Sequence, residues 1–293
     1  MLDMVTQNIV FGILIGALYG LAAVGLSLVF GVTKFLNVAH GELIMLGGYV
    51  CFWLFKLLKL DPFVSLPVTI GALLILGLVI YKLLFVRMVK LTEEVKIKNT
   101  MLIGFGLSLI LQNIALKLWT ADDRGVTTDY SGMVFTIGDI RFPVIRIASL
   151  LIAFIVVVVL QLVLKRTYIG KAIRATVEDW ESASLMGVDV SRVYLYSFVV
   201  GVAMAGIAGT LISVSYSIEP SMGMGWTLKA LIVMVLGGVG SFLGSFVGGI
   251  VLGVTESIST VFIPGSYRQV VGLLLFLLVL IFRPQGLFGQ KER

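Results

Sequence analysis

The residues best suited to chemistry in this 293-residue sequence are three polar side chains in one apolar stretch, Asn37, His40 and Glu42. An imidazole two positions from a carboxylate is able to handle a proton or to contact a charged solute. Ionisable groups in an apolar segment are costly, so they usually face the protein interior or a water-filled cavity and indicate a functional site. Three interpretations remain open: they line a path, form a satisfied structural cluster, or sit at a hydrated lip beside Lys34.

Most catalytic and metal-binding arrangements are excluded by residue counts, because the sequence holds one histidine and one cysteine. His40 alone cannot form the two-histidine HExxH zinc motif, and Cys51 alone cannot form an intrachain disulfide or a cysteine metal cage. An intramembrane enzyme would need a nucleophile with a base, and no spacing supports pairing His40 with a remote serine. We therefore expect no catalytic residue, no metal and no cofactor bound by this chain.

The composition indicates a membrane protein. Hydrophobic residues make up 59% and charged residues 13% of the chain, whereas about 25% of a soluble domain is charged. The net charge of +6 comes from Lys and Arg clustered in loops without interleaved aromatic residues, so it orients the chain in the bilayer and does not indicate nucleic-acid binding. We predict an all-α polytopic membrane protein, one transmembrane domain over residues 1–293. The expected spans are residues 8–30, a glycine-weakened segment at 31–50, and residues 63–85, 101–119, 147–164, 193–216, 242–262 and 270–282.

A glycine-broken segment is expected between the last spans. Gly237, Gly238 and Gly240 interrupt what would otherwise be one helix, and the apolar run before them, residues 228–236, is too short to cross a bilayer. Such irregular backbone is tolerated at membrane depth only where it is buried in protein or lines a cavity. We predict a re-entrant or broken helix here, with the run SMGMGW at 221–226 in an external turn.

Two loops have contrasting charge. The loop at about 165–192 is basic and therefore expected to be cytoplasmic. Within it, residues 177–186 are predicted to form a short helix that Gly187 ends, with acidic residues at its start. This helix is either a plain connector or a docking helix for a partner. The loop at about 120–146 has nearly balanced charge, is expected outside, and contains a predicted hairpin, VFTIGDIRFPV.

An internal repeat is also predicted. A span rich in small residues followed by a glycine-interrupted segment occurs at residues 8–50 and again at 193–240, where MLGG (45–48) resembles VLGG (235–238). The predicted topology gives the two units opposite orientations. This is the pattern of inverted repeats whose broken helices meet at a midplane substrate path.

Three stretches together resemble the permease subunits of branched-chain amino acid ABC importers, the shorter of the two permeases that such importers pair. They are LNVAHGELIMLGGYV, YIGKAIRATVEDWESASLMGVDVSRV, and VLGGVGSFLGSFVGGIVLG followed by a terminal RPQGLFG. Taken singly, the motifs are shared with permeases for sugars, nucleosides and urea.

The resemblance implies that this chain has no ATPase of its own, and the sequence contains no GxxxxGK[ST] phosphate loop. The implied partners are a second homologous permease, two cytoplasmic ATPase subunits that use ATP, and an extracytoplasmic solute-binding protein. The implied location is the prokaryotic inner membrane, with the C-terminus cytoplasmic. The resemblance assigns ATPase coupling to Arg174, Glu178, Asp179, Ala183 and Gly187, and the translocation-path candidates are Asn37, His40, Gly41, Glu42, Gly237, Gly238 and Gly240.

Two other transport functions remain alternatives. A related ABC permease would carry another small solute, such as urea or an amide, a nucleoside or a sugar. An ion-coupled secondary transporter would use His40 and Glu42 to handle protons and would work without partners.

Overall fold

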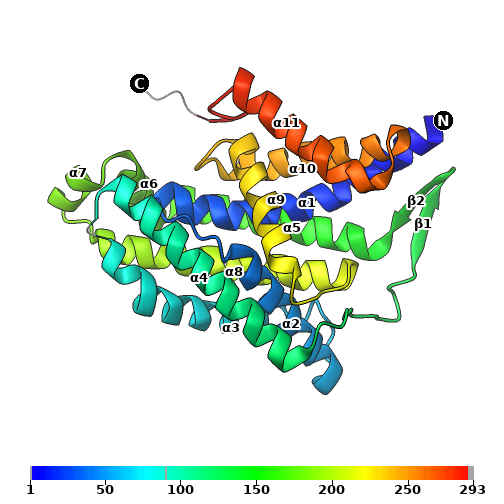
Figure 1. Cartoon of the computed structure of the whole chain (residues 1–293), viewed down its shortest axis with the longest axis horizontal. Helices are drawn as coiled ribbons and strands as arrows, with labels where there is room; N and C mark the ends of the chain where they lie inside the picture. Colours follow the sequence, from blue (N-terminus) through cyan, green and yellow to red (C-terminus); the bar gives the residue numbers. More distant parts are fainter. Residues whose placement is uncertain (1, 90, 290–293) are drawn as a thin grey trace.

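The computed structural model describes residues 2–89 and 91–289, which fold into one bundle of helices with a small hairpin at one end (Figure 1). The helices are α1 (Leu2–Thr33), α2 (His40–Leu58), α3 (Leu66–Ile80), α4 (Glu93–Trp119), α5 (Val144–Arg166), α6 (Tyr168–Glu178), α7 (Trp180–Leu185), α8 (Val190–Ser215), α9 (Met222–Gly237), α10 (Phe242–Phe262) and α11 (Arg268–Phe282). A π-helical turn (Tyr81–Phe85) and a 3-10 turn (Val86–Met88) extend α3, and a 3-10 turn (Gly265–Tyr267) precedes α11.

Eight helices within these described ranges are long and apolar enough to cross a membrane, which confirms the predicted all-α polytopic fold. α9 is the shorter apolar helix expected between spans. The predicted segment at 31–50 is wrong at both ends, because residues 34–39 are not helical and α2 runs from His40 to Leu58. α4 begins at Glu93 and not at residue 101, so part of the predicted basic loop is helical. Glu93 and Glu94 occupy the first turn of α4, where the helix dipole favours carboxylates.

The contact between α1 and α10 depends on glycine. Gly12, Gly16 and Gly20 lie on one face of α1, and a Cβ on any of them would collide with the backbone of α10. For Gly16 the obstacles are the main chains of Gly249 and Ile250. The regular spacing of small residues thus lets two backbones approach closely, as the sequence indicates.

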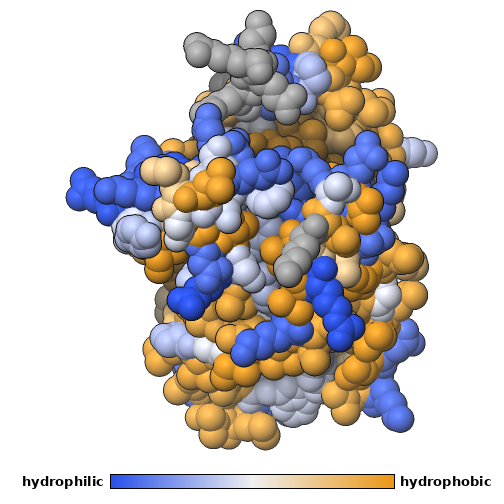
Figure 2. Space-filling view, turned by 90° about the vertical axis from the view of Figure 1, so that its left-hand side faces the viewer, coloured by the Kyte–Doolittle hydropathy of each residue, from blue (hydrophilic) through white to orange (hydrophobic). Residues whose placement is uncertain are grey.

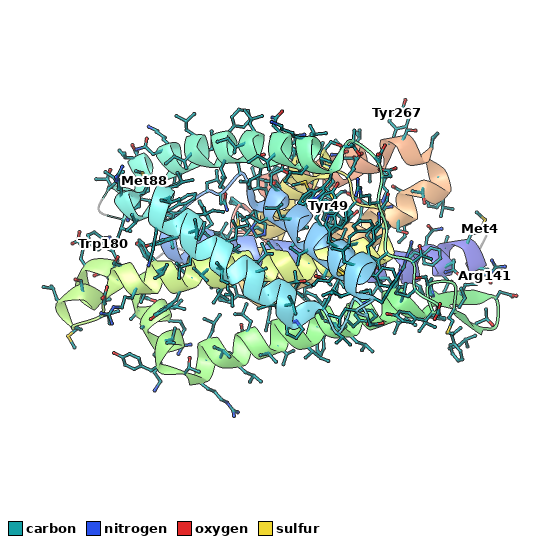
Figure 3. All side chains as sticks on the ribbon, turned by 90° about the horizontal axis from the view of Figure 1, so that it is seen from below. Met4, Tyr49, Met88, Arg141, Trp180 and Tyr267 are labelled. Carbon is teal, nitrogen blue, oxygen red and sulfur yellow. The ribbon has the colours of Figure 1, made fainter. Side chains whose placement is uncertain are left out.

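The two ends of the bundle differ. We call the end with α6 and α7 the basic end; Trp180 and Met88 mark it in Figure 3. Figure 2 faces this end and shows hydrophilic residues (blue) set among hydrophobic ones (orange). We call the other the hairpin end, because β1 (Val134–Ile137) pairs there antiparallel with β2 (Ile140–Pro143), as the sequence predicts. Gln7 in α1 exchanges two hydrogen bonds with the backbone of Arg141, at 2.9 and 2.7 Å, and so fixes the hairpin against α1.

The chain holds two units with matching contacts: α1, α2 and α3 correspond to α8, α9 and α10, in that order. α1 packs on α10 as α8 packs on α3, and α2 packs on α8 as α9 packs on α1. α1 runs from the hairpin end to the basic end and α8 runs back, so the units are antiparallel (Figure 1). The predicted motif correspondence is wrong: MLGG lies inside the uninterrupted α2, whereas VLGG ends α9. The irregular backbone of the first unit lies at residues 34–39, before α2.

Candidate functional site

The first turns of α2 and α9 meet inside the bundle. Residues 34–39 follow α1 and lead back into the protein, where α2 begins beside the middle of α1. The His40 Nε2 atom lies 2.9 Å from the carbonyl oxygen of Ala22. The Thr227 hydroxyl of α9 accepts a hydrogen bond from the Gly41 N–H at 2.8 Å and donates to the Val38 carbonyl at 2.9 Å. One threonine therefore joins the two helix starts, and we call this contact the α2–α9 junction.

Glu42 is the charged group of this junction. It is 1% exposed, and its Oε1 atom accepts a hydrogen bond at 3.1 Å from the Ser108 hydroxyl of α4. Gly223 packs directly on the carboxylate, and a Cβ there would overlap it. Within the described residues no cation pairs with Glu42, and the Ser108 hydroxyl is the group that donates a hydrogen bond to its side chain. The N-terminal turns of α2 and α9 lie beside it.

Three polar atoms of the junction have no hydrogen-bond partner among the described residues: Glu42 Oε2, His40 Nδ1 and Asn37 Nδ2. His40 and Asn37 are each 1% exposed, so the group lies in the interior and not at a hydrated lip. Buried polar atoms normally find a partner, and exceptions suggest a functional role or an ordered water. That these residues line a path stays a prediction.

Gly41 lies at the junction, whereas the other predicted path glycines, Gly237, Gly238 and Gly240, lie elsewhere. α9 ends at Gly237, and Gly238 and Gly240 have φ values of 98° and 80°, a left-handed conformation that favours glycine. The Gly237 carbonyl accepts a hydrogen bond from the Phe288 N–H at 3.2 Å, and the Gly240 N–H donates to the Ser27 hydroxyl at 3.2 Å. This turn therefore sits against the segment after α11 and against the second half of α1, apart from the junction.

The basic loop holds two helices where the sequence predicts one. The predicted start at residue 177 is wrong, because Val177 and Glu178 complete α6 and α7 begins at Trp180. Asp179 between them is extended, with φ −156°, and its Oδ1 atom accepts hydrogen bonds from the N–H groups of Glu181 and Ser182 at 2.9 and 3.2 Å. Asp179 is thus the N-cap of α7.

Both ends of α7 are fixed by local hydrogen bonds. The hydroxyl of Ser182 and backbone N–H groups donate to Asp179 and hold the pKa of its carboxyl below the ordinary value. At the other end Gly187 has φ 87°, and the N–H groups of Gly187 and Val188 donate to the carbonyls of Ser184 and Ala183, each at 3.0 Å. This is a Schellman motif, so Gly187 ends the helix as the sequence predicts.

α7 presents an apolar tip to solvent. Leu185 and Met186 are 89% and 86% exposed. The Lys96 ammonium of α4 lies over the Trp180 ring, 5.6 Å from its centroid, and anchors the start of α7 to the bundle. Of the other predicted coupling residues, Ala183 is 5% exposed and faces the protein. Arg174 is exposed, and its guanidinium donates to the Leu164 carbonyl at the end of α5.

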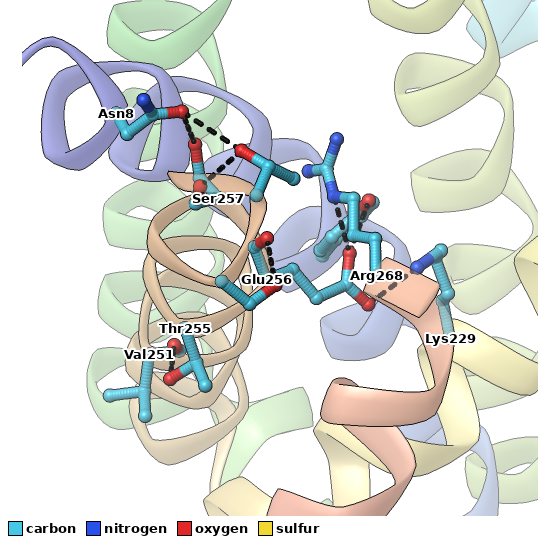
Figure 4. A network of polar contacts seen from close by, with 10 residues as sticks. Asn8, Lys229, Val251, Thr255, Glu256, Ser257 and Arg268 are labelled. Atoms are coloured by element: carbon cyan, nitrogen blue, oxygen red, sulfur yellow. Dashed lines mark hydrogen bonds and ion pairs between the residues drawn. The ribbon is translucent and has the colours of Figure 1, made fainter. Parts of the chain in front are cut away.

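A second buried carboxylate was not predicted from the sequence. Glu256 of α10 is 2% exposed; its Oε1 atom lies 2.7 Å from Lys229 Nζ of α9, and its Oε2 atom lies 3.1 Å from Arg268 Nε of α11 (Figure 4). The Tyr19 hydroxyl also donates to Oε2, at 3.1 Å. The one signal in the sequence is a lone glutamate in an apolar span, which at membrane depth needs a partner.

The run SMGMGW is likewise placed differently from the prediction. Instead of an external turn, residues 222–226 form the first turn of α9, beside Glu42. Gly223 lies at the junction because no side chain fits between α9 and the carboxylate.

Comparison with known proteins places the chain in a family. Residues 8–280 match the family described as "Branched-chain amino acid transport system / permease component". The permease protein BraD of Pseudomonas aeruginosa, named for high-affinity branched-chain amino acid transport, is 31% identical over 98% of this chain and 96% of its own length. The similarly named LivH of Escherichia coli K12 is 29% identical over the same shares, and LivM of that organism is 27% identical over 94% of this chain and 68% of its own length. No solved structure matches the chain significantly. The chain belongs to the family of branched-chain amino acid transport permease components.

Proposed function

We propose that this chain is a transmembrane permease subunit of a binding-protein-dependent ABC importer that carries leucine, isoleucine and valine inward. The observation that carries the proposal is the family match over residues 8–280, together with relatives that align with nearly their whole length. ATP is hydrolysed on separate subunits, and an extracytoplasmic binding protein delivers the solute.

The second permease is a homologue of this chain. The similarity to LivM, a longer permease protein of the same named system as LivH, supports a pair of related permeases. The pair would enclose the path, with the α2–α9 junction contributing Asn37, His40, Gly41 and Glu42 from this side.

The basic end faces the cytoplasm. Lys and Arg are enriched in cytoplasmic loops of membrane proteins, and this end carries Lys165 and Arg166 at the end of α5 together with Lys171, Arg174 and Arg192 in the loop that follows. The segment after α11 packs on the α9–α10 turn at the same end, so the chain terminates on the cytoplasmic side of the inner membrane.

α7 is the coupling helix. Its exposed Leu185 and Met186 suit an apolar groove on an ATPase. Movement of α7 passes to the centre of the bundle through a short, rigid connection: Asp189 accepts from the Arg192 N–H at 3.1 Å and pairs with the Arg192 side chain at 2.8 Å, which fixes the start of α8. α8 packs on α1, α2 and α3, so a rigid-body tilt of these helices would alternate access to the path.

Reconstitution by subunit omission tests the proposal. Proteoliposomes containing this chain, its homologous permease and the ATPases, with the binding protein outside, should take up leucine only when ATP is present on the ATPase side. Omission of any one subunit should stop uptake, and unlabelled valine and isoleucine should compete where urea, nucleosides and sugars do not. Uptake by this chain alone under an ion gradient would show a secondary transporter and reject the proposal.

A further inference from the structure

Two pockets open between α1, α10 and α11 at the hairpin end and share Arg268. The first has a volume of about 180 Å³ and is lined by Arg146 and Arg268, by the polar Asn8, and by the apolar Phe11 and Ile15. The second, of about 290 Å³, is lined by the Glu256 network with Lys229 and Tyr19.

Arg146 brings an uncompensated charge to the first pocket. It lies in the first turn of α5, with its guanidinium 5.6 Å from the ring centroid of Phe11 and 5.0 Å from that of Tyr216. Across residues 2–89 and 91–289 it makes no ion pair and no hydrogen bond, although a guanidinium has five N–H donors. The two rings hold the guanidinium plane in place and leave its donors free for a ligand.

Arg268 faces the same pocket and is held by Glu256. Both Glu256 oxygens are occupied, Oε1 by Lys229 and Oε2 by Arg268 and Tyr19 (Figure 4). Among the described residues Glu256 pairs with Lys229 and Arg268 and makes no ion pair with Arg146. The three cations that line the two pockets face one carboxylate, so the first pocket keeps a positive surplus.

The polar wall of the first pocket is already satisfied. The Asn8 side-chain oxygen accepts hydrogen bonds from the hydroxyls of Ser257 and Thr260 at 3.2 and 3.3 Å, and its amide nitrogen donates to Met4. The arginines are therefore the groups of this pocket that have N–H donors available for a ligand. A planar anion with two oxygens, such as a carboxylate, fits the paired donors of a guanidinium best.

We propose that Arg146 and Arg268 form a binding site for the α-carboxylate of an amino acid whose apolar side chain packs on Phe11 and Ile15. The site rests on the proposed transport function and would receive the solute at the external end before it reaches the path. Glu256 acts as a positioning residue that holds Arg268. The pocket is small, at about 180 Å³, which suits a small carboxylate better than a lipid headgroup.

Direct binding tests the site without transport. The membrane complex of both permeases and the ATPases, without binding protein, is placed in phosphatidylcholine nanodiscs, and binding of labelled leucine is measured. Leucine and 4-methylpentanoate, which keep the carboxylate, should compete; leucinamide, which lacks it, should not. Loss of the charge-assisted fork in Arg146→Gln should weaken leucine binding about 10- to 100-fold.

Two further variants distinguish a loss of the binding site from a general loss of folding. Arg146→Lys retains the cation over Tyr216 but loses the fork, so its binding should fall less than in Arg146→Gln. Arg141→Gln removes an exposed arginine at the same end whose two hydrogen bonds to Gln7 are made by its backbone, so leucine binding should match wild type. ATP hydrolysis in Arg141→Gln should equal that of the wild-type complex.

Three results would overturn the site. They are equal competition by leucinamide, unchanged leucine binding in Arg146→Gln, and bound phosphatidylglycerol in place of leucine when that lipid is added, detected by mass spectrometry of the intact complex. Failure of the proposed function is distinct, because the wild-type complex with its binding protein would then show no ATP-dependent leucine uptake.

Discussion

Gly41 is the residue on which the α2–α9 junction depends most directly. A Cβ at this position would meet the Gly223 carbonyl and the Thr227 hydroxyl. Gly41→Ala must therefore push α9 away, and overpacking of this kind costs about 1–3 kcal/mol. We expect a lower thermal unfolding midpoint and strongly reduced leucine uptake.

Gly225→Ala is the matched control. Gly225 lies in the turn of α9 that also holds Gly223, the residue that Gly41 contacts, but it has open space around it. It should unfold and transport as wild type does. If Gly41→Ala behaved like Gly225→Ala in both measurements, the close packing of the junction would be refuted.

Asp179 gives a pH dependence whose sign follows from its hydrogen bonds. Because the Ser182 hydroxyl and backbone N–H groups lower its pKa below the ordinary value of 3.8, its capping contribution is fully present above that value. It is lost as pH falls through the lowered pKa of the folded protein. Because Asp179 stays ionised from about pH 5 to 8, the protection of the Glu181 and Ser182 amides from hydrogen exchange should not change over that range. Loss of protection within that interval, absent in Asp179→Asn, would contradict this assignment.

The sequence identified some of these residues and missed others for a physical reason. His40 and Glu42 are recognisable because a charge in an apolar segment needs an explanation, and Gly187 because it follows a short helical pattern. Glu256 has the same signal, but its partners Lys229 and Arg268 come from other helices, and only the fold brings them together. Gly223 carries no local sign of its contact with Glu42.

At the scale of elements, the coupling role proposed for α7 requires that this six-residue helix stay folded. Asp179→Ala removes the cap, whereas Asp179→Asn keeps a good capping side chain and removes the charge. We expect Asp179→Ala to hydrolyse ATP with much reduced leucine uptake, and Asp179→Asn to stay close to wild type. The ratio of leucine taken up to phosphate released measures both.

The reverse result would change the assignment. If Asp179→Asn lost uptake as fully as Asp179→Ala, the carboxylate would act through its charge at the docking surface. If neither variant changed the ratio, α7 would not couple ATP hydrolysis to transport.

Element boundaries show where sequence patterns stop being informative. The apolar runs predict the spans because burial in lipid demands them. The division between α6 and α7 is not visible in this way, since residues 168–178 and 180–185 are both helical and only the extended backbone at Asp179 separates them. The predicted start of α9 is wrong because SMGMGW has the composition of a turn, whereas in the structure Gly223 lets the first turn of α9 approach the Glu42 carboxylate.

At the scale of the whole molecule, the packing relates α1, α2 and α3 to α8, α9 and α10. In both units a helix starts inside the bundle after an irregular segment, residues 34–39 before α2 and 216–221 before α9. The antiparallel repeat could be predicted from the order of the spans. The contact between the two units at the junction is formed by the first turns of α2 and α9, and not by the MLGG and VLGG motifs. Helix dipoles directed at one point suit a polar solute, as in other transporters with broken helices.

The most direct test of the account is simultaneous measurement of leucine uptake and phosphate release by the complete complex, with ATP supplied on one side of the membrane at a time. We predict that ATP on the side of α6 and α7 drives leucine across from the hairpin side, and that ATP on the hairpin side drives none. Uptake that needs no ATP, or that responds to ATP only from the hairpin side, would contradict the importer function or the orientation on which it rests.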